Sequence, residues 1–169
     1  MSIESAAELY VHAIAIEREA AERYAEFAER MDREGNFAVA ALFRMLSTIE
    51  ARHLEELKRR AADLKLPPLI ADYTWRDSEA PETAARDVLV RGMTQSHALA
   101  IALQAEKRAR AFFEHAARIA DDPGVRALAR EMAAEEAEHV VLVERMLARM
   151  PPADPDLAFL LGYRGAPGD

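Results

Sequence analysis

The sequence predicts an all-α protein, a bundle of four long helices. Only six of the 169 residues are Gly, whereas Ala, Glu, Arg and Leu, all good helix formers, are abundant. Four long segments carry an apolar stripe at helical spacing, and Pro, Gly, Asp and Asn lie in the breaks between them. No segment has the pattern of a strand. We therefore expect one domain over residues 1–150, followed by a tail at 151–169.

The first two helices are expected to form a hairpin. The first helix is predicted over residues 3–33, with Ser2 or Ser5 as its N-cap. The sequence EGN at 34–36 ends this helix, and the second is predicted over 37–63. Because the break is so short, the two helices should be antiparallel neighbours.

The third and fourth helices are expected to form a second hairpin. A long stretch with prolines, LPPLIADYTWRDSEAP at 66–81, could cross from one end of the bundle to the other. The third helix is predicted over 82–120 and the fourth over 125–150, with a tight turn of sequence DDPG between them. In the irregular tail, residues 157–163 could form a short docking segment.

The two halves of the chain repeat. In the first helix an apolar seam at heptad spacing is interrupted by Glu17, and in the third helix the equivalent seam is interrupted by Glu106. Seven residues further on, Tyr24 in the first half aligns with Phe113 in the second. The halves are therefore similar in pattern but not chemically identical.

A Glu-x-x-His motif lies on the apolar stripe of each remaining helix. The second helix has Glu50 and His53, and the fourth has Glu136 and His139. Residues three apart share one face of a helix, so we predict that all four of these side chains point into the core. Glu135, next to Glu136, lies on a different face and is expected to face water.

Each hairpin places its single glutamate level with its Glu-x-x-His motif. The helical rise puts Glu17 roughly 24 Å and Glu50 roughly 21 Å from the turn between them. In the second hairpin, Glu106 and Glu136 are likewise at nearly the same distance from the turn between them. Four carboxylates and two imidazoles should therefore converge in the middle of the bundle. The candidate metal ligands are Glu17, Glu50, His53, Glu106, Glu136 and His139.

The charge of these carboxylates predicts a metal site. One Glu-x-x-His is unremarkable in a chain so rich in Glu, and a core His is more often a hydrogen-bonded structural residue. Four inward carboxylates are different, because an unpaired buried carboxylate costs several kcal/mol and no Lys or Arg lies on the same stripes. Two divalent cations would neutralise them. Carboxylate and imidazole ligands without thiolate favour iron or manganese over copper or structural zinc.

Composition excludes several other classes of function. The chain has no Cys, which excludes disulfides, thiol catalysis and iron–sulfur clusters. Its net charge of −8 argues against nucleic acid as a partner. No apolar run reaches membrane-spanning length, and the N-terminus lacks the apolar core of a signal peptide. We therefore expect a cytoplasmic protein.

Over residues 3–150 the sequence resembles the ferritin-like superfamily, whose di-iron members use this set of four Glu and two His. The segments AIAIEREAAERYAEFA, IEARHLEEL and EEAEHVVLVERM are most similar to the rubrerythrin family. The resemblance implies two Fe ions, with Mn or Zn as substitutes, and redox chemistry of O2, H2O2 or Fe(II). Glu17 and Glu106 would be terminal or bridging ligands, Glu50 and Glu136 would bridge or chelate, and each His would bind one iron. Tyr24 matches a tyrosine that donates a hydrogen bond near the site.

Two departures from the rubrerythrin pattern affect these expectations. Rubrerythrins usually carry a further Glu three residues after the third-helix ligand, where this chain has Ala109. The Cys-ligated rubredoxin-like domain is absent, so a reductase would need a separate electron-donor protein. Peroxide reduction, Fe(II) oxidation, iron storage of the ferritin type and a metal-stabilised bundle without catalysis all remain open. A homodimer is expected.

Overall fold

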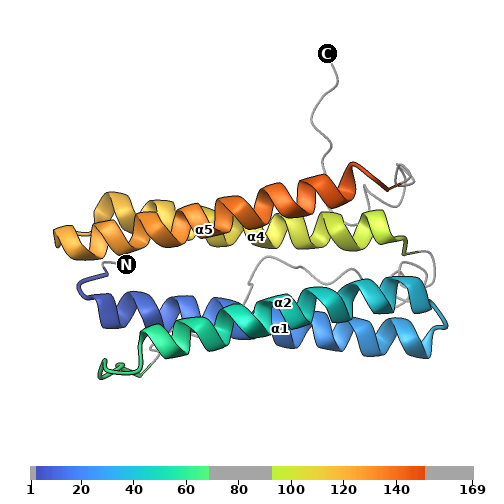
Figure 1. Cartoon of the computed structure of the whole chain (residues 1–169), viewed down its shortest axis with the longest axis horizontal. Coiled ribbons are helices and arrows are strands. Elements are labelled where there is room, and N and C mark those ends of the chain that lie inside the picture. Colours follow the sequence, from blue (N-terminus) through green and yellow to red (C-terminus); the bar gives the residue numbers. More distant parts are fainter. Residues whose placement is uncertain (1–2, 69–92, 151–169) are drawn as a thin grey trace, which may run out of the picture.

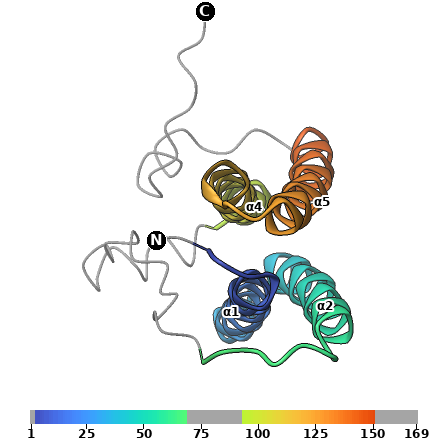
Figure 2. The ribbon, with the colours of Figure 1, turned by 90° about the vertical axis from the view of Figure 1, so that its left-hand side faces the viewer.

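The computed structural model describes residues 3–68 and 93–150, and these form four helices. They are α1 (Ala6–Arg33), α2 (Phe37–Arg60), α4 (Gln95–Ile119) and α5 (Pro123–Leu147). One antiparallel hairpin consists of α1 and α2 and the other of α4 and α5, and the hairpins lie side by side (Figures 1 and 2). α2 and α4 run in the same direction, as a crossover between the hairpins requires (Figure 1). The predicted all-α four-helix bundle is confirmed.

Three of the helices begin at residues that the sequence marks as caps. The Ser5 side chain accepts a hydrogen bond from the Glu8 amide, so Ser5 rather than Ser2 is the N-cap of α1. Asn36 caps α2, and Asp122 caps α5 directly before Pro123. Gly35, whose φ is +74°, allows the chain to leave α1 and enter α2 within three residues.

The predicted start of the third helix is wrong. Residues 93 and 94 are not helical, and α4 begins only at Gln95. The Thr94 hydroxyl accepts the His97 amide, and the His97 ring accepts the Thr94 amide, so these two hydrogen bonds form a capping box at the start of α4. Residues 82–92, part of the predicted helix, lie outside the described residues, as does the predicted tail at 151–169.

The end of α1 at Arg33 and the start of α2 at Phe37 agree with prediction, and the other helix ends differ from it by one to three residues. The first helix starts at Ala6 rather than 3, and the second ends at Arg60 rather than 63. The fourth helix starts at Pro123, two residues earlier than predicted, and ends at Leu147. No helix among the described residues has the length and apolar character needed to cross a bilayer.

The core consists of two apolar clusters, one toward each end of the bundle. One includes Tyr24, Phe43 and Leu99, and the other includes Leu9 and Phe113. A fully buried side chain of this size stabilises the fold by about 2 kcal/mol. Together the clusters offset the cost of the polar layer that lies between them along the helices.

Candidate metal centre

All four predicted glutamates lie in the polar layer between the two apolar clusters. Each helix supplies one of them, and none is more than 6% exposed. His53 and His139 are at the edge of the same layer, with side chains that are 32% and 21% exposed. The structure therefore brings together all six residues: Glu17, Glu50, His53, Glu106, Glu136 and His139.

The histidines of the two hairpins face equivalent pairs of carboxylates. In the second hairpin, Nδ1 of His139 is 3.5 Å from a Glu106 oxygen and 3.4 Å from a Glu136 oxygen. In the first, Nδ1 of His53 is 3.4 Å from Glu50 and 4.0 Å from Glu17. Each histidine thus lies between the glutamate of its own motif and the single glutamate of the neighbouring helix.

The two half-sites meet at the histidine pair. The rings of His53 and His139 stack with their centroids 4.2 Å apart and their planes within 8° of parallel. Ligand atoms of Glu50, His53 and His139 lie within 4.8 Å of one another, as do those of Glu106, Glu136 and His139. His139 belongs to both groups, so the two groups form one continuous cluster.

A small cavity lies between the four carboxylates. Its volume is about 10 Å³, close to the smallest space that holds one water molecule. The remaining wall is apolar and is formed by Ile16, Ala20, Ala105 and Ala109. No Lys or Arg lines this cavity, and none is buried elsewhere in the described part of the chain.

Without a metal, burial favours the protonated form of two of the carboxyl groups. Burial, followed by the charge of Glu50, raises the pKa of Glu17 to about 11. Burial also raises the pKa of Glu106, to about 7. Burial alone would lower the pKa of His139, but the Glu106 and Glu136 carboxylates beside its ring raise it to about 11. The cluster thus has more negative charge than it can keep ionised in a dry interior.

These donors fit divalent metal ions. Nδ1 of His53 and Nδ1 of His139 are buried and make no hydrogen bond of good geometry with the described residues. Each of these ring nitrogens nevertheless lies within 4.0 Å of two carboxylates. A divalent cation would bind both kinds of donor and remove the repulsion.

The sequence matches the family model of Rubrerythrin over residues 8–87 and 97–161. The chain belongs to the rubrerythrin family. Its fold is therefore the ferritin-like four-helix bundle, and its cluster of carboxylates and histidines is a candidate metal site of this family.

A solved structure supports this assignment. The chain is 37% identical to an uncharacterized conserved protein from Magnetospirillum magnetotacticum MS-1. The comparison covers 89% of this chain and 98% of that one, with a TM-score of 0.70. No significant match was found among curated proteins.

Ala109 stands where rubrerythrins usually have an additional glutamate, and it contributes to the cavity wall. Ala20, at the equivalent position of the first half, contributes to the same wall. Both positions three residues after the single glutamates therefore face the site with a methyl group. The residues of this chain that could donate to a metal here are four carboxylates and two imidazoles.

Tyr24 lies in the core, 1% exposed, and its hydroxyl makes no hydrogen bond with the described residues. Burial raises its pKa, and the nearby charges of Glu106 and Glu50 raise it further. Its predicted role as a hydrogen-bond donor to a metal ligand stays a prediction.

The sequence did not identify Arg60, which bonds to Glu131 and Glu135 on the opposite hairpin. Glu135 does point away from the metal ligands, but it binds this arginine rather than water alone. The spacing of the residues predicts this contact only in part. Arg60 lies two helical turns after His53, and Glu131 and Glu135 are four residues apart, so each set shares one face of its helix.

Proposed function

We propose that this protein is a di-iron carboxylate protein that performs redox chemistry with O2, H2O2 or Fe(II) at a dinuclear site. The observation that carries the proposal is the layer of four buried carboxylates without a buried Lys or Arg among the described residues. Four carboxylates balance the charge of two divalent ions, and the two imidazoles provide one nitrogen ligand for each. Mn or Zn could occupy the same donors.

The residues would divide between the two ions by hairpin. Glu17, Glu50 and His53 would supply one half of the site, and the equivalent residues of the second hairpin would supply the other. A pair of irons, when bound, supplies the two electrons that reduction of peroxide consumes. The helices hold the ligands at fixed levels, and the apolar clusters cover the layer toward both ends of the bundle, while the two histidines lie at its partly exposed edge.

The cavity favours a small oxidant over an organic substrate. With a volume of about 10 Å³ and apolar walls of Ala and Ile, it has space for about one water molecule next to the carboxylates and none for an organic substrate. The Tyr24 hydroxyl could donate a hydrogen bond at this position. Because the chain has no Cys, a catalytic cycle that consumes electrons would draw them from a separate protein.

The first experiment measures metal content and then oxidation. The protein is purified without chelator, and bound metal per chain is determined by elemental analysis. The metal-free protein is then loaded with Fe(II) under anaerobic conditions and mixed with H2O2 or O2 in stopped-flow experiments. Two irons per chain and faster oxidation by H2O2 support peroxide reduction. Faster oxidation by O2, with turnover of added Fe(II), supports ferroxidase activity.

Other results favour other functions. Iron that accumulates beyond two per chain, in a large assembly by light scattering, would favour iron storage of the ferritin type. Two bound metals that do not react with either oxidant would favour a metal-stabilised bundle. The absence of metal binding altogether would overturn the proposal.

A further inference from the structure

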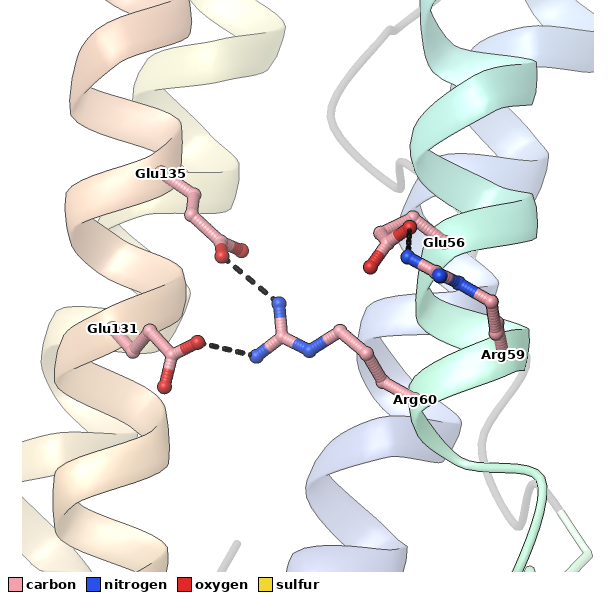
Figure 3. Close-up of polar contacts among 5 residues, drawn as sticks. All are labelled: Glu56, Arg59, Arg60, Glu131 and Glu135. Atoms are coloured by element: carbon pink, nitrogen blue, oxygen red, sulfur yellow. Dashed lines mark hydrogen bonds and ion pairs between the residues drawn. The ribbon is translucent and has the colours of Figure 1, made fainter.

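Arg60 connects the two hairpins. Its Nη1 donates to Glu135 Oε1 at 2.9 Å and its Nη2 donates to Glu131 Oε1 at 2.7 Å, so one guanidinium from α2 binds two carboxylates of α5 (Figure 3). By contrast, the ion pairs Arg44–Asp32 and Lys107–Glu144 join helices within a single hairpin. Arg60 therefore bridges the interface that the metal site also spans.

The guanidinium is held from a third helix as well. Its Cζ lies 5.9 Å from the ring centroid of Tyr10, which belongs to α1. The Arg60 side chain is 21% exposed, much less than the exposed arginine next to it in the chain. The Glu131 and Glu135 side chains are 58% and 45% exposed, but a guanidinium that bonds to two carboxylates at once has a more defined geometry than a single ion pair on the surface.

The bridge is close to the metal ligands on both sides. Arg60 follows His53 by seven residues, about 10 Å along α2. On α5, Glu135 immediately precedes Glu136, and His139 follows four residues later. Because helices are stiff over one or two turns, the distance that Arg60 sets between α2 and α5 is transmitted to the two Glu-x-x-His motifs.

We propose that Arg60 is a positioning residue of the metal centre, which holds the two Glu-x-x-His motifs at binding distance before metal arrives. The inference rests on the proposed metal-binding function. An arginine that bonds across the interface spanned by the site fixes the spacing of α2 and α5 without binding the metal ligands themselves.

The adjacent residue provides a matched control. Arg59 is 76% exposed and pairs with Glu56 on its own helix, so it has the same chemistry as Arg60 but does not reach the other hairpin (Figure 3). Arg60→Met and Arg59→Met thus remove the same charge from consecutive positions of α2. Arg60→Lys keeps a positive charge, but the compact ammonium group is less suited than a guanidinium to bonding with two carboxylates at once.

The test uses Co(II) as the probe, added anaerobically to the metal-free protein and followed by its visible absorption spectrum. For Arg60→Met we expect roughly 10- to 100-fold weaker binding and a changed spectrum, as for other residues that orient metal ligands. Arg59→Met should bind as the unchanged protein does, and Arg60→Lys should recover part of the affinity. If Arg60→Met does not fold, the double variant Glu131→Gln and Glu135→Gln tests the same bridge by removing the charges on α5. This variant should show the same loss of Co(II) affinity.

The outcomes separate this inference from the proposed function. If the unchanged protein binds no Co(II), the metal-site proposal fails, and this inference fails with it. If the unchanged protein binds Co(II), and folded Arg60→Met or the double Gln variant binds it with the same affinity and spectrum, only the positioning role is overturned. An equal loss in Arg59→Met would show a general effect of charge at this end of α2 and would overturn it too.

Discussion

At the scale of single residues, Glu17 shows how a buried carboxylate depends on metal. Because its pKa is raised to about 11, Glu17 is protonated at neutral pH in the metal-free protein. Gln has nearly the shape and charge of protonated Glu. We therefore predict that Glu17→Gln leaves the melting temperature of the metal-free protein almost unchanged but lowers bound metal to fewer than two ions per chain, measured by elemental analysis.

The control for this substitution is Glu138→Gln, which changes an exposed glutamate on α5. This variant should keep the full metal content and the same melting temperature. If Glu17→Gln also kept its full metal content, Glu17 could not be a required ligand, and the site would have to be built from the other five residues.

Tyr24 gives a second prediction at this scale. A buried hydroxyl without a hydrogen bond destabilises a protein by roughly 1–3 kcal/mol, so Tyr24→Phe should not destabilise the metal-free protein and could make it more stable. If the hydroxyl donates to a metal-bound carboxylate, the same change should reduce the stabilisation that metal provides. Melting temperatures with and without Co(II) measure both effects, and an unchanged difference between them would remove Tyr24 from the site.

At the scale of helices, the N-terminus of α4 depends on one side chain. Thr94 accepts the amide of His97, and we predict that Thr94→Ala lowers the free energy of unfolding by about 1 kcal/mol. Thr94→Ser keeps the hydroxyl and should lose much less. Urea denaturation of the metal-free variants measures this difference, and equal stability of the Ala and Ser variants would show that the cap contributes little.

The helices were predictable from sequence to different degrees. Apolar stripes identify where a helix packs, because every third or fourth residue must be buried, and they indicated the four helices and the four buried glutamates, whereas His53 and His139 lie partly exposed at the edge of the layer. A helix end depends on one local hydrogen bond, and nothing in the stripe distinguishes Thr94 from any other threonine. The predicted third helix therefore continued past its true beginning at Gln95.

The contact between hairpins was the least predictable feature of the site. The repeat of Glu and Glu-x-x-His fixes the level of each ligand within its hairpin, since both positions are counted from the same turn. The pairing of Arg60 with Glu131 and Glu135 depends on how the two hairpins are rotated and spaced. Periodicity along one helix contains no information about that arrangement.

At the scale of the whole molecule, the protons of the metal-free site couple stability to pH. Folding raises the pKa of Glu17 from 4.5 to about 11 and that of His139 from 6.5 to about 11. At a pH between the unfolded and the folded pKa of each group, the folded protein binds more protons than the unfolded chain. The free energy of unfolding therefore falls as the pH rises. Favourable protonation of His139 is fully present below its unfolded pKa and is lost as the pH rises through its folded pKa.

Stabilisation by bound metal should depend on pH in the opposite direction. The bound ligands must be deprotonated, so metal binding releases protons and strengthens as the pH rises. We predict that between about pH 6 and about pH 8 the melting temperature of the metal-free protein decreases, while the increase caused by saturating Mn(II) becomes larger. Differential scanning fluorimetry with and without Mn(II) measures both trends. Glu17→Gln has no proton to release at this position, so without metal its melting temperature should depend less on pH. If the increase caused by Mn(II) became smaller as the pH rises, this would contradict a site that holds protons in the absence of metal.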